Sequence, residues 1–182
     1  SEISVLMPIL LDFIKLMNKK YSDMTYVFHS TKENSHFVQS FLKQGAPKNC
    51  EIVSDEKIKS HILQKSIFAV AKSGTVSLEI CNAKIPSIIL YKMGLINFLI
   101  VKSLVKTKYA NIVNFAADKE IIPELLQSKC NSKNIFNNVC NFLESPNKIK
   151  NQVEKVQKIL NELKTNGSSS ELASLSLNKF LS

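Results

Sequence analysis

The sequence predicts an α/β protein with a Rossmann-like parallel sheet flanked by helices. Segments with helical spacing alternate with short apolar segments along the first half of the chain. The short segments at residues 67–71 and 86–91 are continuously apolar, and such strands need cover on both faces, which is typical of parallel sheets. With 182 residues, 45% of them hydrophobic, the chain can bury one sizeable core.

The elements can be assigned in order from spacing and from helix-breaking or capping residues. Strands are predicted at residues 24–30, 51–53, 67–71 and 86–91, and helices at residues 3–17, about 37–42, about 55–64 and 75–82. The first helix tolerates Pro8 only near its beginning. The second stops at Gly45-Ala46-Pro47, and Ser54 or Asp55 caps the third.

The last third of the sequence is predicted to be helical. The helical pattern begins after Asn131 and is broken at Ser145-Pro146. A Gly- and Ser-rich stretch beginning at Thr165 is typical of a hinge, and a last helix is expected at residues 171–181. We therefore predict one α/β domain over residues 1–164 and a separate C-terminal helix over residues 165–182.

The formal charge of +9 suggests an anionic partner such as nucleotide phosphates or a lipid surface. All 24 basic residues are lysine, and because arginine supplies the forked grip on guanine and phosphate, its absence argues against a sequence-specific nucleic-acid reader. A compositional bias with solvated lysines explains the charge equally well. The four cysteines and three histidines are scattered, which predicts no metal site and reduced thiols in a cytoplasmic protein.

The turn Ser73-Gly74-Thr75 is the first candidate site, since it follows the strand predicted at residues 67–71. Ligands of parallel α/β sheets bind where a strand ends and the next helix offers unpaired N–H groups to an anion. Glu79 lies about one helical turn further along, where a carboxylate suits the hydroxyls of a ribose. A Glu79 that only faces solvent is the alternative, and small residues at such a turn are common.

Four motifs in order carry a family resemblance: SGTVSLE at 73–79, YKM at 91–93, LVKTKYANIVN at 104–114 and IIPELLQ at 121–127. Together they resemble the C-terminal half of lipid-A-disaccharide synthases, which are inverting glycosyltransferases with the two-domain GT-B fold. The opening Ser-Glu-Ile is similar to the end of the segment that begins this half. The resemblance implies that residues 1–164 form the UDP-sugar-binding domain and that the upstream acceptor domain is absent from this chain.

The resemblance also implies which residues bind the donor: Ser73, Gly74, Thr75, Glu79, Asn114, Glu124 and Gln127. In this family the Ser-Gly-Thr turn lies beside the pyrophosphate and the following Glu holds the ribose. Asn114 matches the Asn of a Pro-Asn motif, although Val113 replaces the proline. The spacing of Glu124 and Gln127 predicts that both lie on one face of a helix starting at Pro123.

The implied reaction joins UDP-2,3-diacylglucosamine to 2,3-diacylglucosamine 1-phosphate, without a cofactor. No catalytic residue is assigned in this chain, because the family places its base in the N-terminal domain. We therefore expect the isolated chain to bind UDP weakly and to lack transferase activity. The apolar, lysine-containing segment 91–109 could lie on an anionic membrane, as a peripheral inner-membrane protein requires, or pack against the protein. The C-terminal helix could cross to the missing domain or exchange between chains in a homodimer.

Two other functional classes remain open from sequence. A UDP-N-acetylglucosamine 2-epimerase-like enzyme shares the fold and the carboxylate, and would be preferred if Asn114, Glu124 and Gln127 did not line the donor cleft. A non-catalytic α/β interaction module would be preferred if no nucleotide bound and Glu79 were paired with a lysine.

Overall fold

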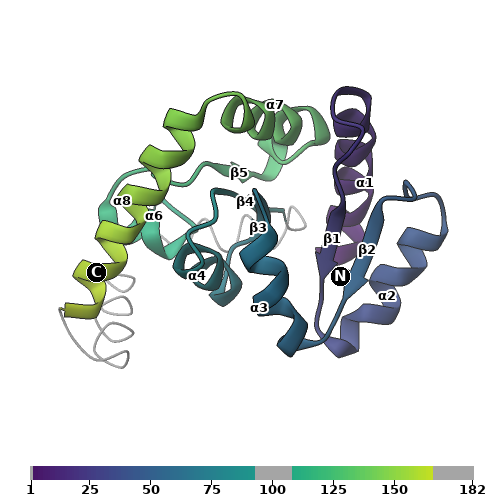
Figure 1. The fold of residues 1–182 in the computed structure, drawn as a ribbon, viewed down its shortest axis with the longest axis horizontal. Coiled ribbons are helices and arrows are strands. Elements are labelled where there is room, and N and C mark those ends of the chain that lie inside the picture. The colour runs from purple at the N-terminus through teal and green to yellow at the C-terminus, as the bar shows by residue number, and fades with distance from the viewer. Residues whose placement is uncertain (1, 93–107, 166–182) are drawn as a thin grey trace.

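The computed structural model describes residues 2–92 and 108–165 and confirms the α/β fold (Figure 1). Its helices are α1 Glu2–Lys20, α2 Lys32–Lys43, α3 Glu56–Lys65, α4 Thr75–Asn82, α6 Ile112–Ala117, α7 Ser132–Leu143 and α8 Pro146–Thr165. Its strands are β1 Tyr26–His29, β2 Cys50–Val53, β3 Ala69–Lys72, β4 Ser87–Tyr91 and β5 Glu124–Leu126, followed by the 3-10 helix η1 Gln127–Lys129.

All strand pairs in the described residues are parallel, but they form two sheets instead of the single sheet that we predicted. β1 pairs with β2, and β3, β4 and β5 are neighbours in that order. The two sheets meet through side chains, since Tyr26 and Phe28 of β1 belong to the same hydrophobic cluster as Val70 and Leu90. One core therefore spans both sheets without a hydrogen-bonded ladder between β1 and β3.

The central strand β4 shows why the apolar segments are continuous. Ile88 and Leu90 face a cluster built with α1 and α7, whereas Ile89 between them faces a second cluster built with α4 and α8. Ile88 and Ile89 are fully buried and Leu90 is 2% exposed. Both faces of the strand are thus covered by helices, as the sequence pattern predicts (Figure 1).

Most of the predicted elements are confirmed, with boundaries shifted by a few residues. The helix predicted at 75–82 is α4 exactly, and the break at Ser145-Pro146 separates α7 from α8. Asp55, not Ser54, caps α3, since its carboxylate accepts a 2.8 Å hydrogen bond from Lys57 N. Pro8 is the seventh residue of α1 and lies within the helix. The predicted helix 171–181 lies outside the described residues, and so does most of the segment 91–109.

The helix predicted from Pro123 is wrong. Residues Glu124–Leu126 form β5, which extends the sheet beyond β4 with Ile89 opposite Glu124. Ile89 N donates to Pro123 O at 2.9 Å, so the open edge of β4 takes up this segment as a strand. Glu124 and Gln127 consequently do not share a helix face.

Candidate functional site

β3, β4 and β5 are parallel, so all three have their carboxyl ends at the same edge of the sheet. The candidate site lies at this edge. Ser73 and Gly74 connect β3 to α4, which begins at Thr75. Gly74 has φ +147°, a conformation that L side chains rarely adopt. Apart from its chain neighbours, no atom of the described residues lies within 4 Å of the position that a Cβ would take, so the turn is open at this point.

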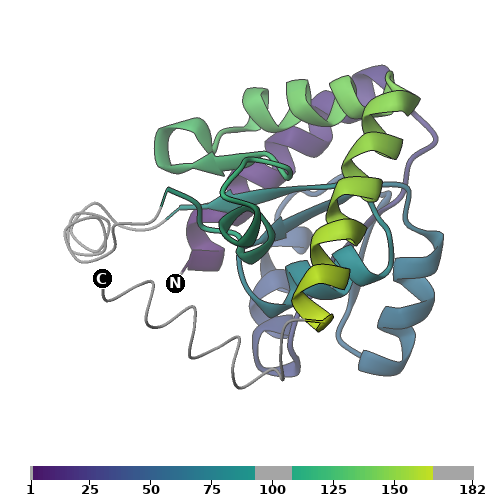
Figure 2. The same cartoon turned by 90° about the vertical axis from the view of Figure 1, so that its left-hand side faces the viewer.

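The first turn of α1 reaches the same edge. Glu2, in that turn, pairs with Lys72, the last residue of β3. Figure 2 shows the N-terminal end of α1 on the side toward which the strands of this sheet run. Two helix N-termini, those of α1 and α4, thus lie near the Ser-Gly-Thr turn. In the described part of the chain no side chain caps the N-terminus of α4.

A buried carboxylate holds the loop in front of this turn. Glu124 is 8% exposed, and its two oxygens accept hydrogen bonds from Ala110 N at 2.7 Å and Asn111 N at 3.0 Å. Ala110 O in turn accepts a hydrogen bond from Ser73 Oγ. The Asn111 side chain donates to Ser77 Oγ at 3.1 Å. Glu124 thereby fixes residues 110–111 against the Ser-Gly-Thr turn.

Asn114 is fully buried beside Glu124 and all its hydrogen bonds are internal. Its Oδ1 accepts from Ile121 N at 2.8 Å and Ile122 N at 2.9 Å. Its Nδ2 donates to Ile122 O at 2.6 Å and to Glu124 Oε1 at 2.7 Å. The structure therefore brings Asn114 and Glu124 together as a pair that shapes the loops behind the turn.

Gln127 lies at the carboxyl end of β5, with backbone φ +49°. Its Nε2 is buried and has no hydrogen-bond partner within the described residues. A buried donor left unpaired costs free energy, so such a group is usually matched by a water or a ligand. Lys92, which follows β4, donates to Cys130 O at 3.2 Å beyond η1 and brings a cation to the same edge.

Glu79 lies in α4, about one turn beyond Thr75, with 46% of its side chain exposed. Its Oε2 is 2.5 Å from Lys59 Nζ of α3, and this pairing is the largest cause of the raised pKa of Lys59. The Lys59 side chain is only 11% exposed. Glu79 is therefore held by a nearly buried ammonium while nearly half of its side-chain surface is exposed.

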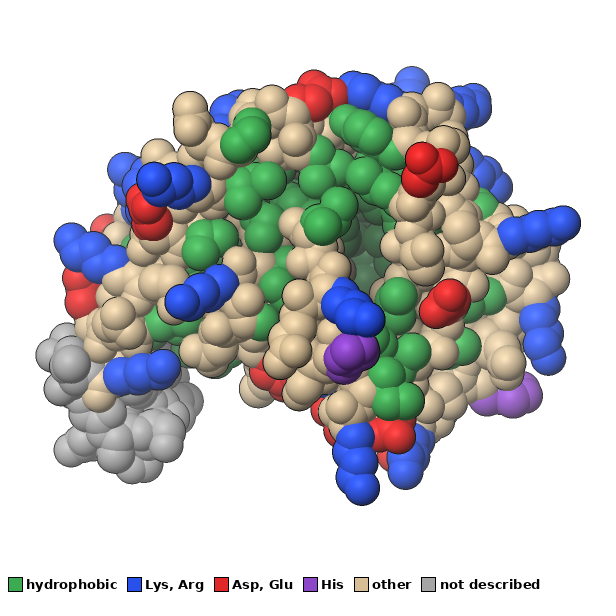
Figure 3. Space-filling view, in the orientation of Figure 1, with side chains coloured by type: hydrophobic (Ala, Val, Ile, Leu, Met, Phe, Trp, Pro, Cys, Tyr) green, Lys and Arg blue, Asp and Glu red, His purple; other side chains and the backbone are tan. Residues whose placement is uncertain are grey.

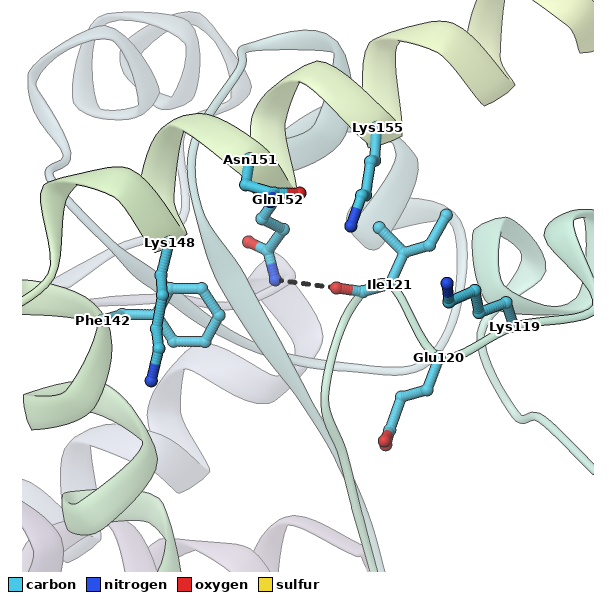
Figure 4. Close-up of a pocket in the computed structure, with 8 residues that line it drawn as sticks. All are labelled: Lys119, Glu120, Ile121, Phe142, Lys148, Asn151, Gln152 and Lys155. Atoms are coloured by element: carbon cyan, nitrogen blue, oxygen red, sulfur yellow. Dashed lines mark hydrogen bonds between the residues drawn. The ribbon is translucent and has the colours of Figure 1, made fainter.

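A separate cavity of about 170 Å³ lies at the opposite ends of the strands (Figure 4). Gln152 of α8 accepts from Ser87 N at 2.8 Å and donates to Ser87 O at 3.0 Å, and Ser87 begins β4. The cavity is lined by Lys119, Glu120, Ile121, Phe142, Lys148, Asn151, Gln152 and Lys155. None of the residues predicted to bind the donor lines it.

Most lysines on the face shown in Figure 3 lie around its border, a few lie nearer its centre, and apolar side chains line the central hollow. On this face the arrangement favours solvated lysines over one concentrated anion-binding patch. No helix in residues 2–92 and 108–165 is long and apolar enough to cross a membrane. The same residues contain no group of three or more His, Cys, Asp or Glu side chains that could hold a metal ion.

Two residues of the site escaped the sequence analysis. Asn111 had a detectable signal: it precedes an apolar pair, and its Oδ1 accepts from Val113 N at 2.9 Å as an N-cap of α6. Lys59 had none, because its contact with Glu79 joins two helices that are separate in the sequence.

Parallel strands that end at a glycine turn and a helix N-terminus are typical of Rossmann-like α/β proteins, the class to which this fold belongs. Comparison with known proteins makes the assignment specific. The family model of lipid-A-disaccharide synthetase matches residues 1–177, and the chain belongs to this family.

Curated relatives carry the same name. The chain is 35% identical to a lipid-A-disaccharide synthase of Rickettsia prowazekii (strain Madrid E) over 158 residues, which cover 86% of this chain and 41% of the relative. It is 34% identical to that of Persephonella marina (strain DSM 14350 / EX-H1) over 167 residues, or 89% of this chain and 44% of the relative. The chain thus spans less than half the length of these relatives.

Proposed function

We propose that this chain is the nucleotide-sugar-binding half of a lipid-A-disaccharide synthase. The complete enzyme would join UDP-2,3-diacylglucosamine to 2,3-diacylglucosamine 1-phosphate and release UDP. The observation that carries the proposal is the open Ser73–Thr75 turn, with Glu79 one helical turn further on, in a chain of this family.

Each predicted site residue has a proposed task. Gly74 lets the pyrophosphate approach the backbone, and Thr75 and the N-terminus of α4 donate hydrogen bonds to it. Glu79 accepts hydrogen bonds from the ribose hydroxyls. The Nε2 of Gln127 is buried and unpaired, so its proposed task is to donate to the donor once binding exposes this atom. The Ser73 hydroxyl already donates to Ala110 O, so we assign Ser73 to the shape of the turn.

Asn114 and Glu124 have a different proposed task from the one that the family resemblance implies. Their polar atoms hold the backbone at residues 110–111 and 121–122, so we propose that they support the donor site from within. Their burial, at 0% and 8% exposure, leaves little surface for a ligand. This placement is the one observation that favours the epimerase-like alternative. The family match over residues 1–177 outweighs it.

Only part of the chemistry belongs to this half. The acceptor hydroxyl would attack the anomeric carbon from the face opposite UDP, and a base would take its proton. That base belongs to the domain absent here. This chain would stabilise the charge that grows on the departing UDP through helix N-terminal N–H groups and Lys92. The isolated chain should therefore bind UDP weakly and transfer no sugar.

The proposal includes an organisation and a location. Residues 1–164 would form the UDP-sugar domain, and residues 165–182 would form a helix that crosses to the acceptor domain or exchanges within a homodimer. Lipid substrates require a membrane surface, so the full protein would be cytoplasmic and peripheral to the inner membrane. The segment 91–109 is the proposed contact, and most of it lies outside the described residues.

Titration with UDP followed by amide NMR shifts tests the nucleotide site. We expect the shifts to cluster at residues 73–79 and 124–127 and the affinity to fall about tenfold or more in Glu79→Ala, as loss of hydrogen bonds to a charged group requires. Glu51→Ala, at an exposed position of β2 in the other sheet, is the matched control. Shifts confined to other regions, or an unchanged affinity in Glu79→Ala, would contradict the proposal.

A further inference from the structure

Lys59 is held between two carboxylates that differ in exposure. Its Nζ lies 2.5 Å from Glu79 Oε2 and 3.2 Å from Glu56 Oε2. The Glu56 side chain is 69% exposed, whereas that of Glu79 is 46% exposed. Because exposed pairs are weakened by solvent, the contact with Glu79 is the stronger constraint on both side chains.

The ammonium cannot easily leave Glu79. The Lys59 side chain is 11% exposed, and a nearly buried charge is stable only when it is paired. Glu56 is itself shared with His29, whose Nε2 lies 3.4 Å from Glu56 Oε1 at the end of β1. The pair therefore holds the Glu79 side chain in one orientation before any ligand arrives, while nearly half of that side chain stays exposed.

We propose that Lys59 is a positioning residue that holds the Glu79 carboxylate in the orientation that accepts the ribose hydroxyls of a nucleotide. The inference rests on the proposed nucleotide site. A glutamate that must be immobilised on binding loses rotamer freedom at that moment, and Lys59 removes this cost in advance. Neither a motif nor a family residue assigned above includes Lys59.

The test compares UDP with 2',3'-dideoxy-UDP, which lacks the two hydroxyls, by the same NMR titration of the chain. We expect Lys59→Met to weaken UDP binding about threefold to tenfold, the cost of ordering one side chain. Binding of the dideoxy compound should not change. Lys57→Met, an exposed lysine on the same helix, should alter neither ligand. In a Glu79→Ala background, Lys59→Met should have no further effect on UDP.

A purely structural role for Lys59 would weaken both ligands equally and would overturn the proposal. Equal or tighter UDP binding by Lys59→Met would overturn it too, because Lys59 would then occupy Glu79 instead of presenting it. Lys59→Gln is the second variant if Lys59→Met does not fold. If the unmodified chain binds no UDP at millimolar concentration, the nucleotide site itself fails and this inference fails with it. If the unmodified chain binds UDP and Lys59→Met binds it equally well, only the positioning role of Lys59 is refuted.

Discussion

Asn114→Asp tests the buried pair behind the Ser-Gly-Thr turn with an almost isosteric change. The new carboxylate can still accept from Ile121 N and Ile122 N, as Asn114 Oδ1 does. Its second oxygen, however, replaces an amide that donates to Ile122 O at 2.6 Å and Glu124 Oε1 at 2.7 Å. The new oxygen, itself an acceptor, would then face two other acceptors at a position with no exposure to solvent.

The variant either keeps both carboxylates ionised or binds one proton on the pair, and the state with the smaller free-energy cost determines the loss of stability. Two ionised carboxylates with oxygens 2.7 Å apart repel by about 6 kcal/mol at an effective dielectric constant of about 20. Keeping one proton on the pair at pH 7, about three units above an ordinary carboxyl pKa, costs about 4 kcal/mol. At pH 5 this cost falls to about 1 kcal/mol. A further loss of about 1 kcal/mol persists at both pH values, because the shared proton satisfies only one of the two acceptors.

The sign of the pH dependence is fixed by linkage. The folded variant binds a proton that the unfolded chain releases near pH 4, so one carboxyl of the pair has a raised pKa in the fold. Stability relative to the unmodified chain is therefore greatest below that pH and falls as the pH rises. Urea unfolding followed by circular dichroism at pH 5 and pH 7 measures the difference, which we expect to be about 3 kcal/mol.

Asn114→Ala is the control, because it removes the same hydrogen bonds without adding a carboxylate. It should destabilise the chain by a similar amount at both pH values, since Ile121 N and Ile122 N lose their acceptor. A deficit of Asn114→Asp that is equal at pH 5 and pH 7 would refute the placement of Asn114 against Glu124.

Two further predictions concern a partly buried tyrosine and a buried cysteine elsewhere in the fold. Burial raises the pKa of Tyr26 to about 12. The folded chain therefore keeps a proton that the unfolded chain loses near pH 10, and stability should fall between pH 10 and 12. In urea unfolding, the unmodified chain should lose about 1 kcal/mol more stability from pH 9 to pH 11 than Tyr26→Phe does. Equal losses would contradict this prediction. Burial also raises the pKa of Cys81 to about 11. Iodoacetamide at pH 8 should therefore modify the less buried Cys50 before Cys81, which mass spectrometry can follow. Equal rates of modification would argue against the packing of α4.

The parts of the fold that follow from local pattern were predictable from sequence. The continuous apolar run of β4 correctly predicted cover on both faces, and the small residues at 73–75 correctly predicted where α4 begins. The segment beginning at Pro123 was not predictable in this way. Proline followed by an acidic residue fits the first turn of a helix, but hydrogen bonding along β4 makes it a strand. Tertiary pairing overrode the local preference.

The candidate site divides in the same way. The turn at Gly74 could be located from sequence because glycine there has a local, conformational cause. The partners of Asn114, Glu124 and Glu79 could not, because each is paired with a group contributed by another segment of the chain. Sequence spacing carries no information about such contacts.

The residues that carry the family resemblance thus fall into two sets with separable consequences. Asn114 and Glu124 bond within the protein, so their substitution should lower stability and nucleotide binding together. Gln127 has an unpaired amide, so its substitution should lower binding with little change in stability. Substitution of the half-exposed Glu79 should lower binding and also remove the main partner of the nearly buried Lys59. A resemblance at Asn114 and Glu124 reports a shared scaffold, and under the proposed function only Glu79 and Gln127 would report directly on the ligand. Measuring stability and binding for one member of each set therefore separates a shared architecture from a working donor site.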